Sequence, residues 1–209
     1  PGGTGKSTTA QMLGKNAGYV YYEGDCFRTC KNPYINLDAE EPGKIQYQRN
    51  LIGEGLDARR KAYQKAIESF EKVMLGEDFV MENYKEFYGM MCEDIKKERN
   101  RIGGDWVVAQ TIMNREIRDF IKSCLGPELV FVVLNMEEEE LKKRILSRSP
   151  EDSNLNEEVF NRMMAVTKLS EPAGDDEENA LEVMLTHDMT KEDVTNKILQ
   201  TVQQFKMED

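Results

Sequence analysis

The chain has 209 residues, 39% hydrophobic and 32% charged, which is enough apolar material to bury one sizeable core. Its 28 Lys and Arg against 39 Asp and Glu give a net charge of −11, which argues against a nucleic-acid or anionic-membrane surface. With no apolar run of membrane-spanning length and no visible secretory leader, we expect a cytoplasmic protein with neither nucleic acid nor membrane as a partner.

The first eight residues match most of a phosphate-binding loop of the Walker type, in which a Gly is followed by four residues and then Gly-Lys-Ser/Thr. Gly5, Lys6 and Ser7 supply the end of this pattern. Glycines let backbone N–H groups turn toward phosphates, Lys reaches the β- and γ-phosphates, and the Ser hydroxyl ligates Mg²⁺. We therefore predict ATP and Mg²⁺ as cofactors. The predicted nucleotide-binding residues of the loop are Gly2, Gly3, Thr4, Gly5, Lys6, Ser7 and Thr8.

A helix is expected over residues 8–14, with its N-terminus directed at the bound anion. Residues 18–22 are aromatic and β-branched and predict a strand. Asp25 comes just after this strand, at the edge where open α/β sheets bind ligands. Because a strand ordinarily runs into a phosphate loop, we expect the first strand of the sheet to lie ahead of Pro1, outside the given sequence.

Residues 37–102 interrupt this pattern and predict a helical insertion on the acceptor side of the site. Apolar side chains recur at helical spacing between residues 56 and 74, and residues 84–101 form a second helix-like stretch. We interpret the segment as an insertion between strands, so that residues 1–209 form a single P-loop domain.

The alternation of strands and helices then resumes. Strands are expected at residues 106–109, 129–134 and 181–185, and helices at residues 115–124, at 137–148 and after Thr190, which caps the last one. Such alternation predicts an α/β fold, a three-layer P-loop arrangement with a parallel sheet flanked by helices.

Four cysteines are spread along the chain without the spacing of a metal site, and the chain has one His. We expect free, reduced thiols. The four are Cys26, Cys30, Cys92 and Cys124.

Three further segments, together with the loop, resemble the small gluconokinases, which are P-loop relatives of shikimate and adenylate kinases. They are residues 21–27 (YYEGDCF), 107–119 (VVAQTIMNREIRD) and 169–172 (LSEP). The resemblance covers almost the whole chain outside the helical insertion. After the loop, its more specific part is the stretch from residue 163 to residue 176.

This resemblance implies an ATP-dependent phosphotransferase acting on a hydroxyl of a small, anionic metabolite, as a monomer or a homodimer. Asp25 matches the family's strand-end acid, which faces the acceptor hydroxyl and Mg²⁺, so the implied metal ligands are Ser7 and Asp25. Lys6, Asp25 and Arg148 are the implied catalytic residues. Arg144 and Arg148 would reach ATP from the helix that enters a lid at residues 148–170.

The acceptor side is implied to consist of an acid and several arginines, since Asp can orient and deprotonate a hydroxyl and Arg can fork onto a carboxylate or phosphate. These residues are Asp25, Arg28, Arg49, Arg115 and Arg118. The chain departs from the family here, with Arg28 in place of a His and Asn114 before Arg115 in place of a basic residue. Two alternatives therefore stay open: a nucleoside monophosphate kinase of the adenylate-kinase type, and an ATP-binding regulatory module without catalysis.

Overall fold

The computed structural model describes residues 4–24, 56–112, 114–147, 161, 164–165 and 167–208. The chain divides into two compact units, and each is described by itself. Unit 1 comprises Pro1–Thr9, Thr111–Arg115 and Glu128–Asp209, and unit 2 comprises Ala10–Gln110 and Glu116–Pro127.

Helix α1 (Lys6–Ala17) is longer at both ends than the predicted stretch of residues 8–14. It starts early because the Thr9 N–H already donates to the Gly5 carbonyl oxygen at 2.9 Å. It continues through the expected end and stops at Gly18, whose φ of 75° is the left-handed conformation in which helices commonly terminate. The strand that follows consequently starts two residues later than predicted.

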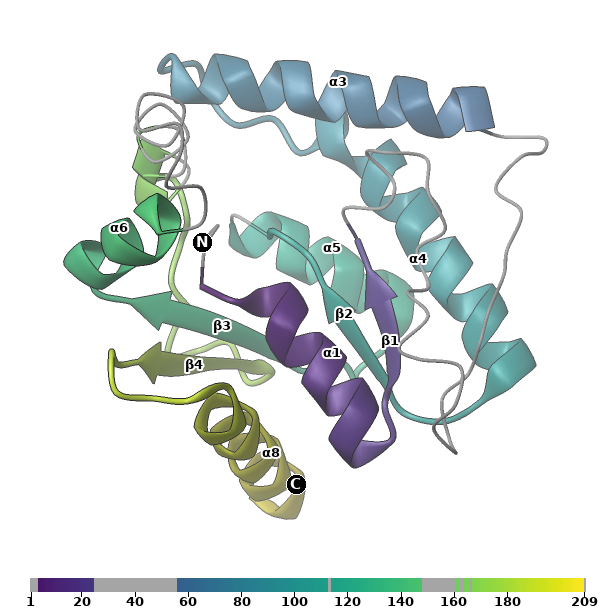
Figure 1. Cartoon of the computed structure of the whole chain (residues 1–209). Helices are drawn as coiled ribbons and strands as arrows, with labels where there is room; N and C mark the ends of the chain where they lie inside the picture. The colour runs from purple at the N-terminus through teal and green to yellow at the C-terminus, as the bar shows by residue number, and fades with distance from the viewer. Residues whose placement is uncertain are drawn as a thin grey trace. The chain divides into compact units, whose positions relative to one another are not determined.

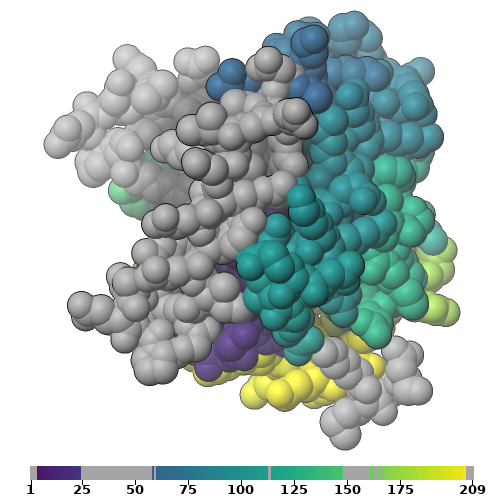
Figure 2. All heavy atoms as spheres, turned by 90° about the vertical axis from the view of Figure 1, so that its right-hand side faces the viewer, coloured from purple at the N-terminus to yellow at the C-terminus, as the bar shows by residue number. Residues whose placement is uncertain are grey.

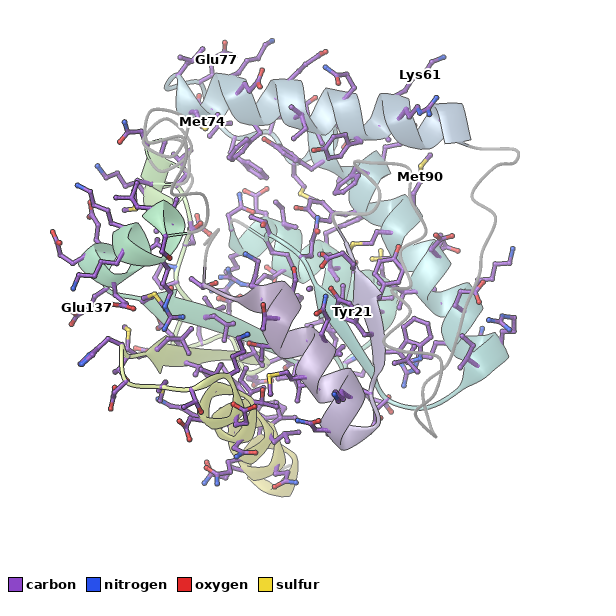
Figure 3. The ribbon with its side chains drawn as sticks, viewed as in Figure 1. Tyr21, Lys61, Met74, Glu77, Met90 and Glu137 are labelled. Atoms are coloured by element: carbon purple, nitrogen blue, oxygen red, sulfur yellow. The ribbon has the colours of Figure 1, made fainter. Side chains whose placement is uncertain are left out.

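Strands β1 (Val20–Glu23) and β2 (Trp106–Ala109) are parallel neighbours in unit 2 (Figure 1), paired from Val20 opposite Trp106 onward. Side chains of β1, β2 and α1 form a small core, which includes Tyr21 (Figure 3). Its members are Ala10, Tyr21, Val107 and Ala109.

Helices α3 (Leu56–Met74) and α4 (Glu82–Ile102) pack against each other in unit 2, and their atoms form a continuous surface in Figure 2. The Tyr63 and Phe87 rings meet edge to face with centroids 5.6 Å apart, whereas Lys61 points away from α4 (Figure 3). Both helices predicted between residues 56 and 102 are therefore observed, and residues 37–55 lie outside the described residues. Helix α5 (Arg115–Leu125) also ends within one residue of its prediction.

Strands β3 (Phe131–Met136) and β4 (Ala180–Leu185) form a second parallel pair, in unit 1. The prediction of residues 129–134 placed the first of these strands two residues too early. Asn179 explains the shift, because its Nδ2 donates to the Leu129 carbonyl oxygen at 3.0 Å and so replaces a backbone partner there.

Two helices accompany this pair in unit 1. Helix α6 (Glu138–Leu146) buries Leu141 and Ile145, which pack with Met136 and with Met164 from the predicted lid region. Of residues 148–163, only residue 161 is among the described residues. Helix α8 (Lys191–Glu208) packs on β4, where Lys197 Nζ donates to the Met184 carbonyl oxygen at 3.0 Å.

The described strands thus form two separate parallel pairs. The parallel direction is confirmed. These short pairs do not confirm the single sheet or the three-layer arrangement, which stay predictions, as does the strand ahead of Pro1. Among the described residues, no helix combines the length and apolarity needed to cross a membrane.

Thr190 is the predicted cap of α8, and it forms a reciprocal capping box with Asp193. The Asp193 N–H donates to Thr190 Oγ1 at 3.1 Å, and the Thr190 N–H donates to Asp193 Oδ2 at 2.9 Å. We expect Thr190→Ala to lower the free energy of unfolding by about 1 kcal/mol, measured by urea denaturation. Thr201→Ala is the matched control, because Thr201 lies inside α8 and bonds its own helix at Lys197. Equal losses in the two variants would contradict a capping role.

Candidate functional site

The end of the phosphate-loop motif lies at the start of α1, in unit 1. Gly5 has φ 88°, a conformation that side chains rarely adopt, and among the described residues none outside its chain neighbours places an atom within 4 Å of the position that a Cβ would take. The backbone conformation therefore favours glycine here. Thr4 beside it is 2% exposed, which fixes the loop where it enters the helix.

Lys6, Ser7 and Thr8 occupy the first turn of α1. The first N–H groups of an α-helix have no acceptor within the helix, and together with the helix dipole they favour an anion. Lys6 and Ser7 are half-buried and Thr8 is exposed. The first turn of α1 therefore favours an anion, while Gly2 and Gly3, which are predicted to complete the loop, lie outside the described residues.

The end of β1 carries a buried carboxylate that sequence reasoning missed. Glu23 is 8% exposed and accepts a hydrogen bond from the Tyr21 hydroxyl. The two residues are two positions apart along the strand, so their side chains lie on the same face of it. Asp25, the acid that was predicted for this edge, lies outside the described residues.

Gly24 is held tightly against the end of β2. Its N–H donates to the Ala109 carbonyl oxygen at 2.9 Å. A Cβ on Gly24 would collide with Oε1 of Gln110, lying 2.8 Å from the Gln110 Cδ and 2.9 Å from the Ala109 carbonyl oxygen. Gly is therefore required by crowding where β1 leads toward Asp25. The sequence shows that Gly24 directly follows Glu23 at the end of the strand. It does not indicate that Gln110 packs against Gly24.

Arg115, the predicted acceptor ligand, is surrounded by acids from the segment that contains the LSEP motif. Its backbone N–H donates to Glu171 Oε2 at 2.7 Å, and its Nη1 donates to both carboxylate oxygens of Asp176 at 2.8 Å. The Arg115 and Asp176 side chains are 44% and 72% exposed, so water screens this ion pair and a ligand can compete for the guanidinium.

The same contact predicts the titration of Asp176. The hydrogen bond from Arg115, with its positive charge, holds the pKa of the Asp176 carboxyl below the ordinary value of 3.8. Because the folded-state pKa is lowered, the stabilisation is present at neutral pH and is lost as the pH falls through that pKa. We expect NMR titration to place the Asp176 midpoint below 3.8 and Arg115→Ala to raise it. An unchanged midpoint in Arg115→Ala would contradict the contact.

The other predicted arginines have different surroundings. Arg118 is 3% exposed within α5, so it is a buried cation in unit 2. Arg144 lies on α6 and donates through Nε to Glu140 Oε1 at 3.2 Å, one helical turn away. Three further predicted site residues lie outside the described residues, namely Arg28, Arg49 and Arg148. The described residues contain no cluster of three or more His, Cys, Asp or Glu side chains able to hold a metal ion.

No protein-family model and no curated protein matches the chain. Among solved structures, the crystal structure of a gluconokinase from Sinorhizobium meliloti 1021 aligns with a TM-score of 0.56 and 16% identity, covering 97% of this chain and 87% of that chain. The two proteins share a fold. At this identity the likeness establishes an α/β arrangement of helices and parallel strands similar to that of a gluconokinase, and nothing finer.

Proposed function

We propose that the protein is a kinase that transfers the γ-phosphoryl group of ATP to a hydroxyl of a small, anionic metabolite. The observation that carries the proposal is the loop at the start of α1, where Gly5 takes the left-handed conformation and Lys6 and Ser7 begin the helix. The fold shared with a gluconokinase supports the kinase class.

On the donor side, the loop residues from Gly2 to Thr8 surround the phosphates, with Lys6 neutralising charge on the β- and γ-phosphates. Arg144, in the last turn of α6, and Arg148, four residues later in the sequence, are proposed to contact ATP. Arg144 is paired with Glu140 and is partly exposed, so contact with ATP requires exchange of that partner.

Mg²⁺ fits the donor side through the Ser7 hydroxyl, a hard oxygen ligand in the first turn of α1. Asp25 is proposed as the second protein ligand. When bound, the ion would neutralise negative charge on the transferring phosphoryl group.

On the acceptor side, Asp25 orients and deprotonates the acceptor hydroxyl, and arginines hold its anionic group. The proposed arginines are Arg28, Arg49, Arg115 and Arg118. For Arg115 the anion must compete with Asp176, which is mostly exposed and therefore held weakly enough to exchange.

Turnover by the unmodified chain, compared with turnover by Asp25→Asn, distinguishes the proposal from an ATP-binding regulatory module. Calorimetry measures ATP affinity and a coupled assay measures turnover with each acceptor tested. We expect the variant to bind ATP but to lose turnover, because the amide cannot act as a base. An unmodified chain that binds ATP without any turnover would indicate the regulatory module, and faster turnover with nucleoside monophosphates than with sugar acids would indicate the adenylate-kinase type.

A further inference from the structure

Helices α4 and α5 come close together in unit 2. A Cβ on Gly89 of α4 would lie 3.9 Å from Cζ of Phe120 on α5, so the Phe120 ring reaches α4 at this turn. One turn further along each helix lie Cys92 and Cys124, at i+3 and i+4 spacings that keep them on the same helix faces. The Cys124 thiol is near enough to contribute to the raised pKa of Cys92, and neither thiol forms a disulfide.

The two thiols differ in access to solvent. Cys92 is 0% exposed, whereas Cys124 is partly exposed. Burial, with the neighbouring Cys124 thiol, raises the pKa of Cys92 to about 12. Cys124 is therefore the sulfur that a dissolved oxidant reaches first, and Cys92 is a protected thiol on the neighbouring helix.

We propose that Cys92 and Cys124 are a reversible oxidation site that closes an intrachain disulfide between α4 and α5. The inference is independent of the proposed kinase activity, because it rests on the contact between two helices and on thiol chemistry alone. A peroxide is the class of oxidant that the chemistry requires.

Oxidation of the two thiols by a peroxide proceeds in two steps. The Cys124 thiolate attacks one peroxide oxygen, the O–O bond breaks, and after protonation a sulfenic acid and water result. The Cys92 sulfur then attacks the Cys124 sulfur, the S–O bond breaks, and a second water leaves as the S–S bond forms. The two thiols are oxidised by two electrons in total, and the peroxide is reduced to water.

The high pKa of Cys92 gives this reaction a pH signature. The thiolate is the attacking species, and burial, the largest cause of the raised pKa of Cys92, persists after Cys124 is oxidised. Disulfide closure after sulfenic acid formation therefore accelerates as the pH rises.

The test treats the native, unmodified chain with dilute hydrogen peroxide, blocks the remaining thiols and maps peptides by mass spectrometry. We expect a peptide pair joined through Cys92 and Cys124, lighter by two hydrogen atoms and separated again by dithiothreitol. Cys92→Ala, which keeps an apolar side chain at the buried position, should leave Cys124 as sulfenic or more oxidised acid without this crosslink.

Three results would overturn the proposal. They are complete oxidation of Cys124 without the crosslink, pairing of Cys124 with Cys26 or Cys30 instead, and a crosslink that forms only after denaturation. The peptide map of the unmodified chain decides among them even if a Cys92 variant fails to fold.

Discussion

Replacing Lys6 with alanine is expected to lower phosphotransfer from ATP by at least about 100-fold, while the chain stays folded. Lys6 is the first residue of α1, next to the left-handed Gly5, and is half-buried there. A positive charge at this position would stabilise charge that shifts between the β- and γ-phosphates during transfer, and alanine cannot replace it.

The measurement is the initial rate of phosphorylation, with a thermal melt to confirm folding. Lys15→Ala is the matched control, because Lys15 is an exposed lysine in the last turn of the same helix. We expect that control to keep its rate. A Lys6→Ala variant as active as Lys15→Ala would remove the loop from the proposed mechanism.

Gly24→Ala is expected to lower the free energy of unfolding by about 1–3 kcal/mol, a typical result of overpacking. The added Cβ would collide with Gln110 Oε1, but the Gln110 side chain could turn away and relieve this collision. It would also lie 2.9 Å from the Ala109 carbonyl oxygen, which is fixed by the hydrogen bond from the Gly24 N–H. The end of β1 must therefore shift, and with it the chain leading to Asp25, so turnover should fall as well.

Urea denaturation of Gly24→Ala alone and combined with Gln110→Ala separates these two collisions. The double variant should recover part of the loss, because the side-chain collision is removed and the backbone one is not. Gly89→Ala is the control: its Cβ would lie an ordinary 3.9 Å from Phe120, inside a helix, where alanine is favoured over glycine by up to about 1 kcal/mol. Equal destabilisation by Gly24→Ala and Gly89→Ala would contradict the crowding at Gly24.

The helices and strands could be predicted from the sequence because their signals are local. Runs of aromatic and β-branched residues gave the strands, and helical spacing gave α3 and α4. Boundaries shifted where one residue overrode the pattern, as when Asn179 bonded the Leu129 carbonyl oxygen and delayed β3.

The surroundings of the candidate site were not predictable in the same way. Arg115 and Asp176 are 61 residues apart, and neither spacing nor composition indicates that they pair. The contact between Gly24 and Gln110 likewise joins the ends of two strands separated by both α3 and α4. The loop was recognisable because its residues are consecutive in the sequence. The acceptor-side residues are far apart in the sequence, so only the fold decides which of them are neighbours.

The most direct test of the central claim uses ATP radiolabelled in its γ-phosphate, Mg²⁺ and a panel of sugar acids, polyols and nucleoside monophosphates. We expect label to appear on a sugar acid when the unmodified chain is present. The label should be lost when the chain is omitted or is replaced by Lys6→Ala. Tight ATP binding with no label on any acceptor would contradict the account.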